Sequence, residues 1–267
     1  MAESNTKFFQ AIKKRSLIVK QGGAGAGVTG LVGFTSLLAI GSILFVTENY
    51  FISMLVISVG LLIYVTGTDV GRVFLSAFTI FFSTRHLIPK AVYIQETLAA
   101  LREALHFIRD SKGEIKSGPL QPGQSISLPD NPLVKDIQRL LAEEKGFDYA
   151  EYVVHSYYVE CHELYDYSSA NFDFVSVSMP IVGLMGTILG LMSMFDNLGG
   201  DITVEALSPQ LAMALKNTLY GAFFAVVYKI MGSRFEQRIR ALDYDYETFC
   251  RALQVLIENK VRIEISQ

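Results

Sequence analysis

Two long apolar stretches in the second half of the chain most constrain its fold. Residues 174–198 contain MPIVGLMGTILGLMSMF, and residues 207–231 contain LAMALKNTLYGAFFAVVYKIM. Roughly 20 residues of helix, rising about 1.5 Å each, cover the hydrocarbon layer of a bilayer. We therefore expect a hairpin of two transmembrane helices here.

Both predicted helices carry small residues along one face. On the first helix these fall at intervals of three, four and three residues, at Pro180, Gly183, Thr187 and Gly190. On the second they fall at four, three and four, at Ala214, Thr218, Gly221 and Ala225. Small residues let another backbone approach, and close packing drives helix association in lipid. Each face is therefore expected to receive a neighbouring helix, with a threonine hydroxyl in its middle.

These residues resemble the MotA/TolQ/ExbB proton-channel family, the membrane subunits of ion-driven motors. The third span of the family reads Pro-x-x-Gly-x-x-Gly-Thr-x-x-Gly-Leu, which is matched at Pro180, Gly183, Gly186, Thr187, Gly190 and Leu191. The fourth span of its flagellar branch ends Thr-Leu-Tyr-Gly-Ala, which is matched at residues 218–222. Either glycine motif alone would be weak evidence for the resemblance, because such spacing is common in membrane helices.

Two further spans are predicted upstream, at residues 25–47 and 51–66. The second is expected to continue into residues 73–82, either as one longer tilted helix or as a helix at the membrane interface. Asp69 and Arg72, three residues apart, could form an ion pair on one face.

Basic residues lie before the first span, after the second and after the fourth. The other two links contain acidic residues but no Lys or Arg. This distribution predicts that both termini and the middle segment are cytoplasmic. The expected fold class is an all-α integral membrane protein, with four transmembrane helices and a helical cytoplasmic domain between spans two and three. That order resembles the flagellar stator A subunit.

Five segments follow from this reading. They are a cytoplasmic N-terminal segment (1–24), a first transmembrane hairpin with an interfacial helix (25–83), a cytoplasmic helical domain (84–173), a second transmembrane hairpin that forms the ion-channel core (174–231) and a cytoplasmic C-terminal helix (232–267).

Within the cytoplasmic domain, residues 90–110 are predicted to form an amphipathic helix and residues 111–130 a Gly/Pro/Ser-rich loop. Asn131 is the expected N-cap of the next helix, with Pro132 at its first position, and Gly146 is expected to close it. A third helix should run from residue 148 straight into span three. Span four should continue as a helix over residues 233–258.

Charged residues on the first of these helices could contact a cytoplasmic rotor or load protein. The candidates are Arg102, Glu103, Arg109 and Asp110. A solvated helix face explains them equally well. In flagellar relatives this region continues with a hydrophobic and then acidic pattern, which residues 114–118 lack, so the pattern for rotor contact is incomplete here.

Spans one, three and four contain no Asp or Glu in their cores, and Asp69 lies near the cytoplasmic end of span two. The resemblance implies that the ion carrier is an Asp on a single-span MotB/ExbD-like partner. A dimer of this partner would sit inside a homo-oligomeric ring, of five copies by analogy.

The resemblance assigns the ion pathway to Thr187, Thr218 and Asn217. It gives Pro180 a hinge role and Gly183, Gly186, Gly190 and Gly221 roles in helix packing. Each threonine could instead bond back to a carbonyl one turn earlier. Lys216 either lies at the pore mouth, which we favour, or faces the pore and meets an acid of the partner.

The expected cargo is H⁺ or Na⁺, with no other cofactor, no metal site and no enzyme activity. The net charge of −3 gives no broad attraction to nucleic acid, and the expected surroundings are membrane lipid. A bacterial inner membrane is the setting that the family implies. Two alternatives remain: an ExbB/TolQ-like energiser of another process, such as outer-membrane transport or gliding, and a non-conducting membrane scaffold.

Overall fold

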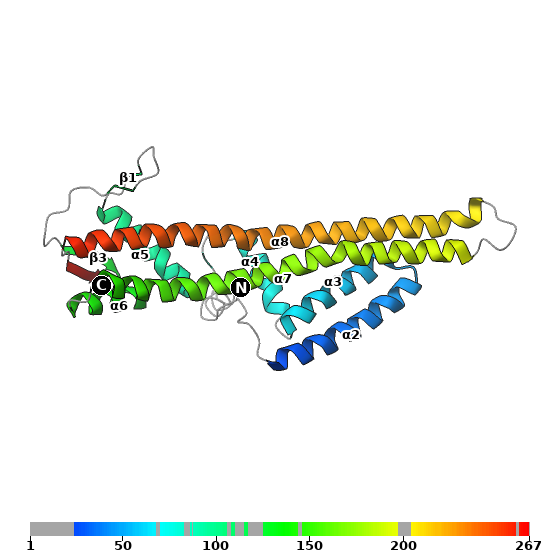
Figure 1. Ribbon diagram of the computed structural model, residues 1–267, viewed down its shortest axis with the longest axis horizontal. Coiled ribbons are helices and arrows are strands. Elements are labelled where there is room, and N and C mark those ends of the chain that lie inside the picture. Colours follow the sequence, from blue (N-terminus) through cyan, green and yellow to red (C-terminus); the bar gives the residue numbers. More distant parts are fainter. Residues whose placement is uncertain are drawn as a thin grey trace, which may run out of the picture. The chain divides into compact units, whose positions relative to one another are not determined.

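The computed structural model describes residues 24–67, 70–82, 86, 88–105, 108–109, 115–116, 125–143, 146–196, 204–259 and 262–266. The described residues fall into two compact units. Unit 1 consists of the described residues within Phe82–Tyr165 and Gln237–Gln267, and unit 2 of those within Ile18–Phe81 and Asp166–Glu236. Two long helices, α7 (Phe147–Asp196) and α8 (Val204–Glu258), each contribute to both units (Figure 1).

Unit 2 opens with the helical hairpin of α2 (Ala24–Val46) and α3 (Tyr50–Thr66), which confirms the first two predicted helices within one residue at each end. A Cβ added to Gly30 would lie 2.7 Å from the carbonyl oxygen of Tyr64, so glycine is needed for this close approach. The Ser53 hydroxyl donates to the Gly41 carbonyl at 2.8 Å across the pair.

Helix α3 ends at Gly67, whose φ of 65° suits glycine and breaks the helix. A separate helix follows, α4 (Val70–Phe82), so the alternative of one long continuous helix is wrong. Helix α4 is amphipathic, because Val73, Ala77 and Ile80 are buried while Phe78 is exposed. The predicted ion pair of Asp69 with Arg72 lies outside the described residues and side chains.

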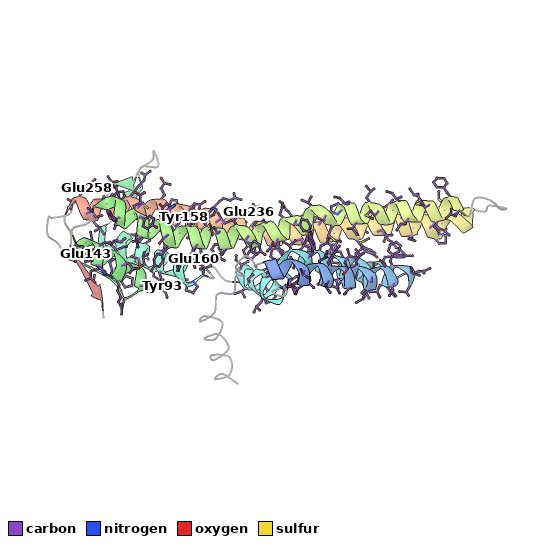
Figure 2. All side chains as sticks on the ribbon, turned by 60° about the horizontal axis from the view of Figure 1, so that its bottom comes forward. Tyr93, Glu143, Tyr158, Glu160, Glu236 and Glu258 are labelled. Carbon is purple, nitrogen blue, oxygen red and sulfur yellow. The ribbon has the colours of Figure 1, made fainter. Side chains whose placement is uncertain are left out.

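Unit 1 contains α5 (Pro89–Leu105) and α6 (Pro132–Ala142), together with the first part of α7 and the last part of α8. The predicted N-cap is confirmed: the Asn131 side chain accepts from the Val134 N–H at 2.9 Å, and Pro132 takes the first helical position. The side-chain amide of Asn131 also donates to the Thr97 hydroxyl at 2.9 Å. In Figure 2, Glu160 marks the stretch of α7 that bonds Lys90 of α5, at 2.5 Å.

Short strands make the fold class predominantly rather than wholly α. The helix predicted over residues 90–110 ends at Leu105, because β1 (Ile108–Arg109) pairs antiparallel with β2 (Ile115–Lys116). Strand β3 (Ser125–Pro129) lies in the predicted loop and pairs in parallel with β4 (Arg262–Ser266), in the segment predicted to be a C-terminal helix. The facing residues Ile126 and Ile263 are both buried, and their burial stabilises this pair.

The two long helices are continuous, as the sequence predicts for spans three and four. Gly146, however, does not close α6, which already ends at Ala142; it lies just before α7. In the described part of the chain, α2, α7 and α8 contain stretches long and apolar enough to cross a membrane. Helix α3, with 17 residues, is at the short end of the range for a span.

Candidate functional site

Within unit 2, α7 and α8 run antiparallel side by side and pack through their predicted small-residue faces (Figure 1). A Cβ on Gly221 would lie 2.8 Å from the Gly183 Cα, and one on Gly190 would lie 3.0 Å from the Ala214 Cβ. Each helix therefore packs directly against the small-residue face of the other helix. At these glycines, the neighbouring helix that each face was expected to receive is the other helix of the same chain.

Thr187 and Thr218 meet at one edge of this helix pair, where their two hydroxyls are hydrogen-bonded to each other. Thr187 also donates toward the Gly183 carbonyl at 3.1 Å and the Ala214 carbonyl at 3.2 Å. The bond back to a carbonyl one turn earlier is thus present, and Thr187 also bonds across to α8; its role in an ion pathway stays a prediction. The cluster offers uncharged oxygen atoms at an exposed edge, and such atoms can coordinate a cation or hold a water molecule.

Asn217 lies in the helix interface rather than at that edge. Its side chain is fully buried over Gly186, where an added Cβ would meet the Asn217 Cγ at 2.9 Å. Neither its amide nitrogen nor its oxygen has a hydrogen-bond partner among the described residues. Leaving such a group unpaired costs about 1–3 kcal/mol, so a group or water that pairs with it in another state would stabilise that state.

Pro180 lies on the exposed side of α7, which continues through it without a break in its helical assignment. Lys216 is exposed on α8. It precedes Thr218 by two residues, and two residues turn a helix by about 200°, so Lys216 faces away from the threonine edge. This placement disfavours a shared pore lining for Lys216 and Thr218.

A further charged pair on the same two helices was not anticipated from the sequence. The Lys229 ammonium of α8 lies 2.5 Å from the Asp173 carboxylate of α7. The sequence could have placed only one member of this pair on the side of Thr187, because Asp173, Pro180 and Thr187 follow one another on α7 at seven-residue intervals. Residues seven apart lie on nearly the same side of a helix.

Some of the residues predicted to contact a cytoplasmic partner already make contacts within unit 1. Arg102 pairs with Asp245 at 3.3 Å and lies over the Tyr244 ring at 5.6 Å. Glu103 is exposed. The side chain of Arg109 and the whole of Asp110 lie outside what the structure describes.

His86 is a buried polar residue of unit 1 that the sequence did not single out. Its Nδ1 lies 3.3 Å from the Tyr165 hydroxyl and its Nε2 lies 4.0 Å from Asp245. Burial, with the Arg238 charge as a second cause, lowers the pKa of His86 to about 4. Its imidazole is therefore neutral at pH 7. Among the described residues no group of His, Cys, Asp and Glu could hold a metal ion.

Residues 130–248, which include the threonine edge, match the model of the MotA/TolQ/ExbB proton channel family. This segment belongs to that family. The MotA/TolQ/ExbB match contains all of α7 and most of α8, so it covers Thr187, Thr218 and the Asp173–Lys229 pair.

The chain is also similar to a solved structure, "Structure of C. jejuni MotAB". The alignment covers 87% of this chain and 90% of that chain, with 16% sequence identity and a TM-score of 0.52. The shared fold therefore extends beyond the segment that matches the MotA/TolQ/ExbB model. The comparison with curated proteins finds no match.

Proposed function

We propose that this protein is an ion-channel subunit of a stator-type membrane motor, which couples the flow of H⁺ or Na⁺ to mechanical force. It crosses a bacterial inner membrane four times, through α2, α3 and the apolar parts of α7 and α8, with both termini in the cytoplasm. Family membership of residues 130–248 and a fold shared with the C. jejuni MotAB structure support this proposal.

The observation that carries the proposal is the threonine edge. Two hydroxyls meet between apolar helices, and no Asp or Glu occurs in α2, in α3, or in residues 174–195 and 208–231. The two threonine hydroxyls can solvate a passing cation but cannot carry a proton through the membrane by themselves, because neither threonine is a titratable group. A carboxylate must come from elsewhere. We assign it to an Asp on a dimer of a single-span MotB/ExbD-like partner, enclosed by a ring of five copies of this chain.

Ion flux through the intact complex tests the proposal. The complex is purified from its source membranes through an affinity tag on this chain and reconstituted into proteoliposomes. The wild-type complex should conduct H⁺ or Na⁺ down an imposed gradient. Thr187→Ala and Thr218→Ala should each lower the flux about tenfold or more, because each removes a hydroxyl from the edge.

Ser178→Ala is the matched control. Ser178 lies on the same helix and its hydroxyl bonds back to the Phe174 carbonyl at 2.8 Å, but it faces away from Thr187. Its substitution should leave the flux unchanged. If both threonine variants conduct like the wild type, the chain is better explained as a non-conducting scaffold.

A second candidate is an ExbB/TolQ-like energiser of a process other than flagellar rotation. It is favoured by the segment that follows α5, where strands β1 and β2 form and residues 114–118 lack the hydrophobic and then acidic pattern of flagellar relatives. Deletion of the gene separates the two candidates. Loss of swimming assigns the motor to a flagellum, and normal swimming with a defect in transport or gliding assigns it to the second process.

A further inference from the structure

The threonine edge of α7 and α8 does not end at the threonines. On α7, Asp173 lies fourteen residues before Thr187, with Pro180 midway, so the three share one side of the helix. On α8, Lys229 lies eleven residues after Thr218, which is close to three full turns. The Asp173–Lys229 pair therefore lies on the same edge, about 16 Å along α8 from the threonines.

The opposite side of the α7–α8 pair is covered by α3. Phe51 of α3 packs against the Tyr220 and Phe224 rings, with centroids 5.4 and 5.3 Å away. The Tyr167 hydroxyl donates to the Val65 carbonyl at 3.3 Å. The edge with the threonines is turned away from these contacts, and the side chains of Lys229 and Asp173 are 59% and 45% exposed.

We propose that Asp173 is the cation-accepting end of the ion pathway and that Lys229 occupies its carboxylate between transits. This inference rests on the proposed function. It extends the site from two hydroxyls to a charged end point on the cytoplasmic side. Pro180, which lies between Asp173 and Thr187, has no backbone N–H to donate to the carbonyl one turn earlier. That carbonyl oxygen is therefore a further polar atom of α7.

The chemistry is an exchange of cations on one carboxylate. An arriving proton binds the Asp173 carboxylate to give the neutral acid, the Lys229 ammonium leaves, and the proton then passes to water as the ion pair re-forms. A sodium ion would be held and released by the same carboxylate oxygens. An exposed lysine–carboxylate pair is weak, so Lys229 can be displaced and can return on its flexible stem.

This exchange predicts unequal effects of removing the two charges. In the reconstituted complex, Asp173→Asn should lower ion flux about tenfold or more, because the acceptor is lost and the lone ammonium repels cations. Lys229→Gln should keep flux within about twofold of the wild type, because the carboxylate remains. The double variant should conduct better than Asp173→Asn alone, since it removes the repelling charge.

A pair that merely braces the two helices predicts a different pattern, in which both single variants and the double variant lose flux alike. That pattern overturns the inference, and so does unchanged flux in Asp173→Asn. Glu247→Gln is the matched control, because it removes another exposed ion pair of α8, with Arg251 at 2.7 Å, in unit 1; its flux should equal that of the wild type.

Recovery of the assembled complex is measured for every variant by size-exclusion chromatography. Asp173→Glu keeps the carboxylate and should both assemble and conduct. If Asp173→Asn fails to assemble while Glu247→Gln assembles, the pair is a structural brace and the inference fails. A wild-type complex without flux overturns the proposed function and this inference together. Flux that is lost in Thr187→Ala but kept in Asp173→Asn overturns this inference alone.

Discussion

Burial decides the protonation state of His86. Its side chain is enclosed in unit 1 beside the Tyr165 hydroxyl and Asp245, and the pKa falls from 6.5 to about 4. Below pH 6.5 the unfolded chain binds a proton at this residue, whereas the folded chain stays neutral until about pH 4. The unfolded state therefore binds more protons between these pH values, and acidification favours unfolding.

We expect the thermal unfolding midpoint of the detergent-solubilised protein to fall as the pH is lowered from 7 to 5. The contribution of His86 to this loss is at most about 1.4 kcal/mol per pH unit. His86→Gln should reduce the slope, because glutamine does not titrate. Burial raises the pKa of Asp245, and this shift opposes the loss of stability on acidification. Asp245 is present in both the wild type and His86→Gln, so it does not account for a difference between their slopes.

His155→Gln serves as the control, because His155 is exposed and bonds the Tyr246 hydroxyl at 3.1 Å. It should keep the slope of the wild type. Equal slopes for His86→Gln and the wild type would contradict the assignment of the acid sensitivity to His86.

At the scale of elements, the packing of α7 on α8 depends on glycines that touch backbone. A Cβ at Gly221 would lie 2.8 Å from the Gly183 Cα and 2.9 Å from the Met179 carbonyl oxygen. Backbone atoms cannot rotate away as a flexible side chain can. We therefore expect Gly221→Ala to push the helices apart, with a loss of about 1–3 kcal/mol of stability. The thermal unfolding midpoint of the purified complex measures it.

Gly71 supplies the matched control, because a Cβ added there meets nothing within 4 Å. Gly71→Ala in α4 should leave the midpoint unchanged or raise it, since alanine lowers the entropy of the unfolded chain. A midpoint for Gly221→Ala equal to that for Gly71→Ala would contradict the close packing of α7 and α8.

The sequence predicts features that depend on neighbours along one helix. The Asn131 cap, the apolar lengths of α2 and α3 and the small faces of α7 and α8 are of this kind, because helical geometry alone places their residues. Pairing between distant segments is not encoded in this way. Strand β3 pairs with β4 across more than a hundred residues, and its alternation of Ile126 and Leu128 with serines is too short to stand out.

The same distinction holds for the candidate site: spacing along one helix is predictable from the sequence, whereas contacts between helices are not. Spacing predicts that Thr187 and Thr218 each lie on a small-residue face. It does not specify what each face meets, and the faces meet each other. Asn217 is adjacent to Thr218 in sequence, yet a turn of about 100° places it in the interface. Only the tertiary structure shows that the Asp173 carboxylate reaches Lys229.

At the scale of the whole molecule, the number of spans fixes which side of the membrane each segment faces. Helix α3 decides this number, because its 17 residues give about 25 Å of helix against about 30 Å of hydrocarbon. Its neighbours favour crossing: it packs along α2 through Gly30 and Gly41, so the two apolar helices enter the same layer. The basic residues before α2 and after α4 favour a cytoplasmic location for both flanks.

We therefore expect single cysteines at Thr47→Cys and Gly200→Cys to react with a membrane-impermeant maleimide added outside, and Gln267→Cys to react only after the membrane is opened. If α3 did not cross, every later segment would change sides: Gly200→Cys would become protected and Gln267→Cys would react from outside, while Thr47→Cys would still react. The native Cys161 is buried and Cys250 is half-buried, so the unsubstituted chain supplies the background. Four crossings put the Asp173–Lys229 pair on the cytoplasmic side of the threonines, whereas three would put it outside and reverse the direction in which a cation leaves.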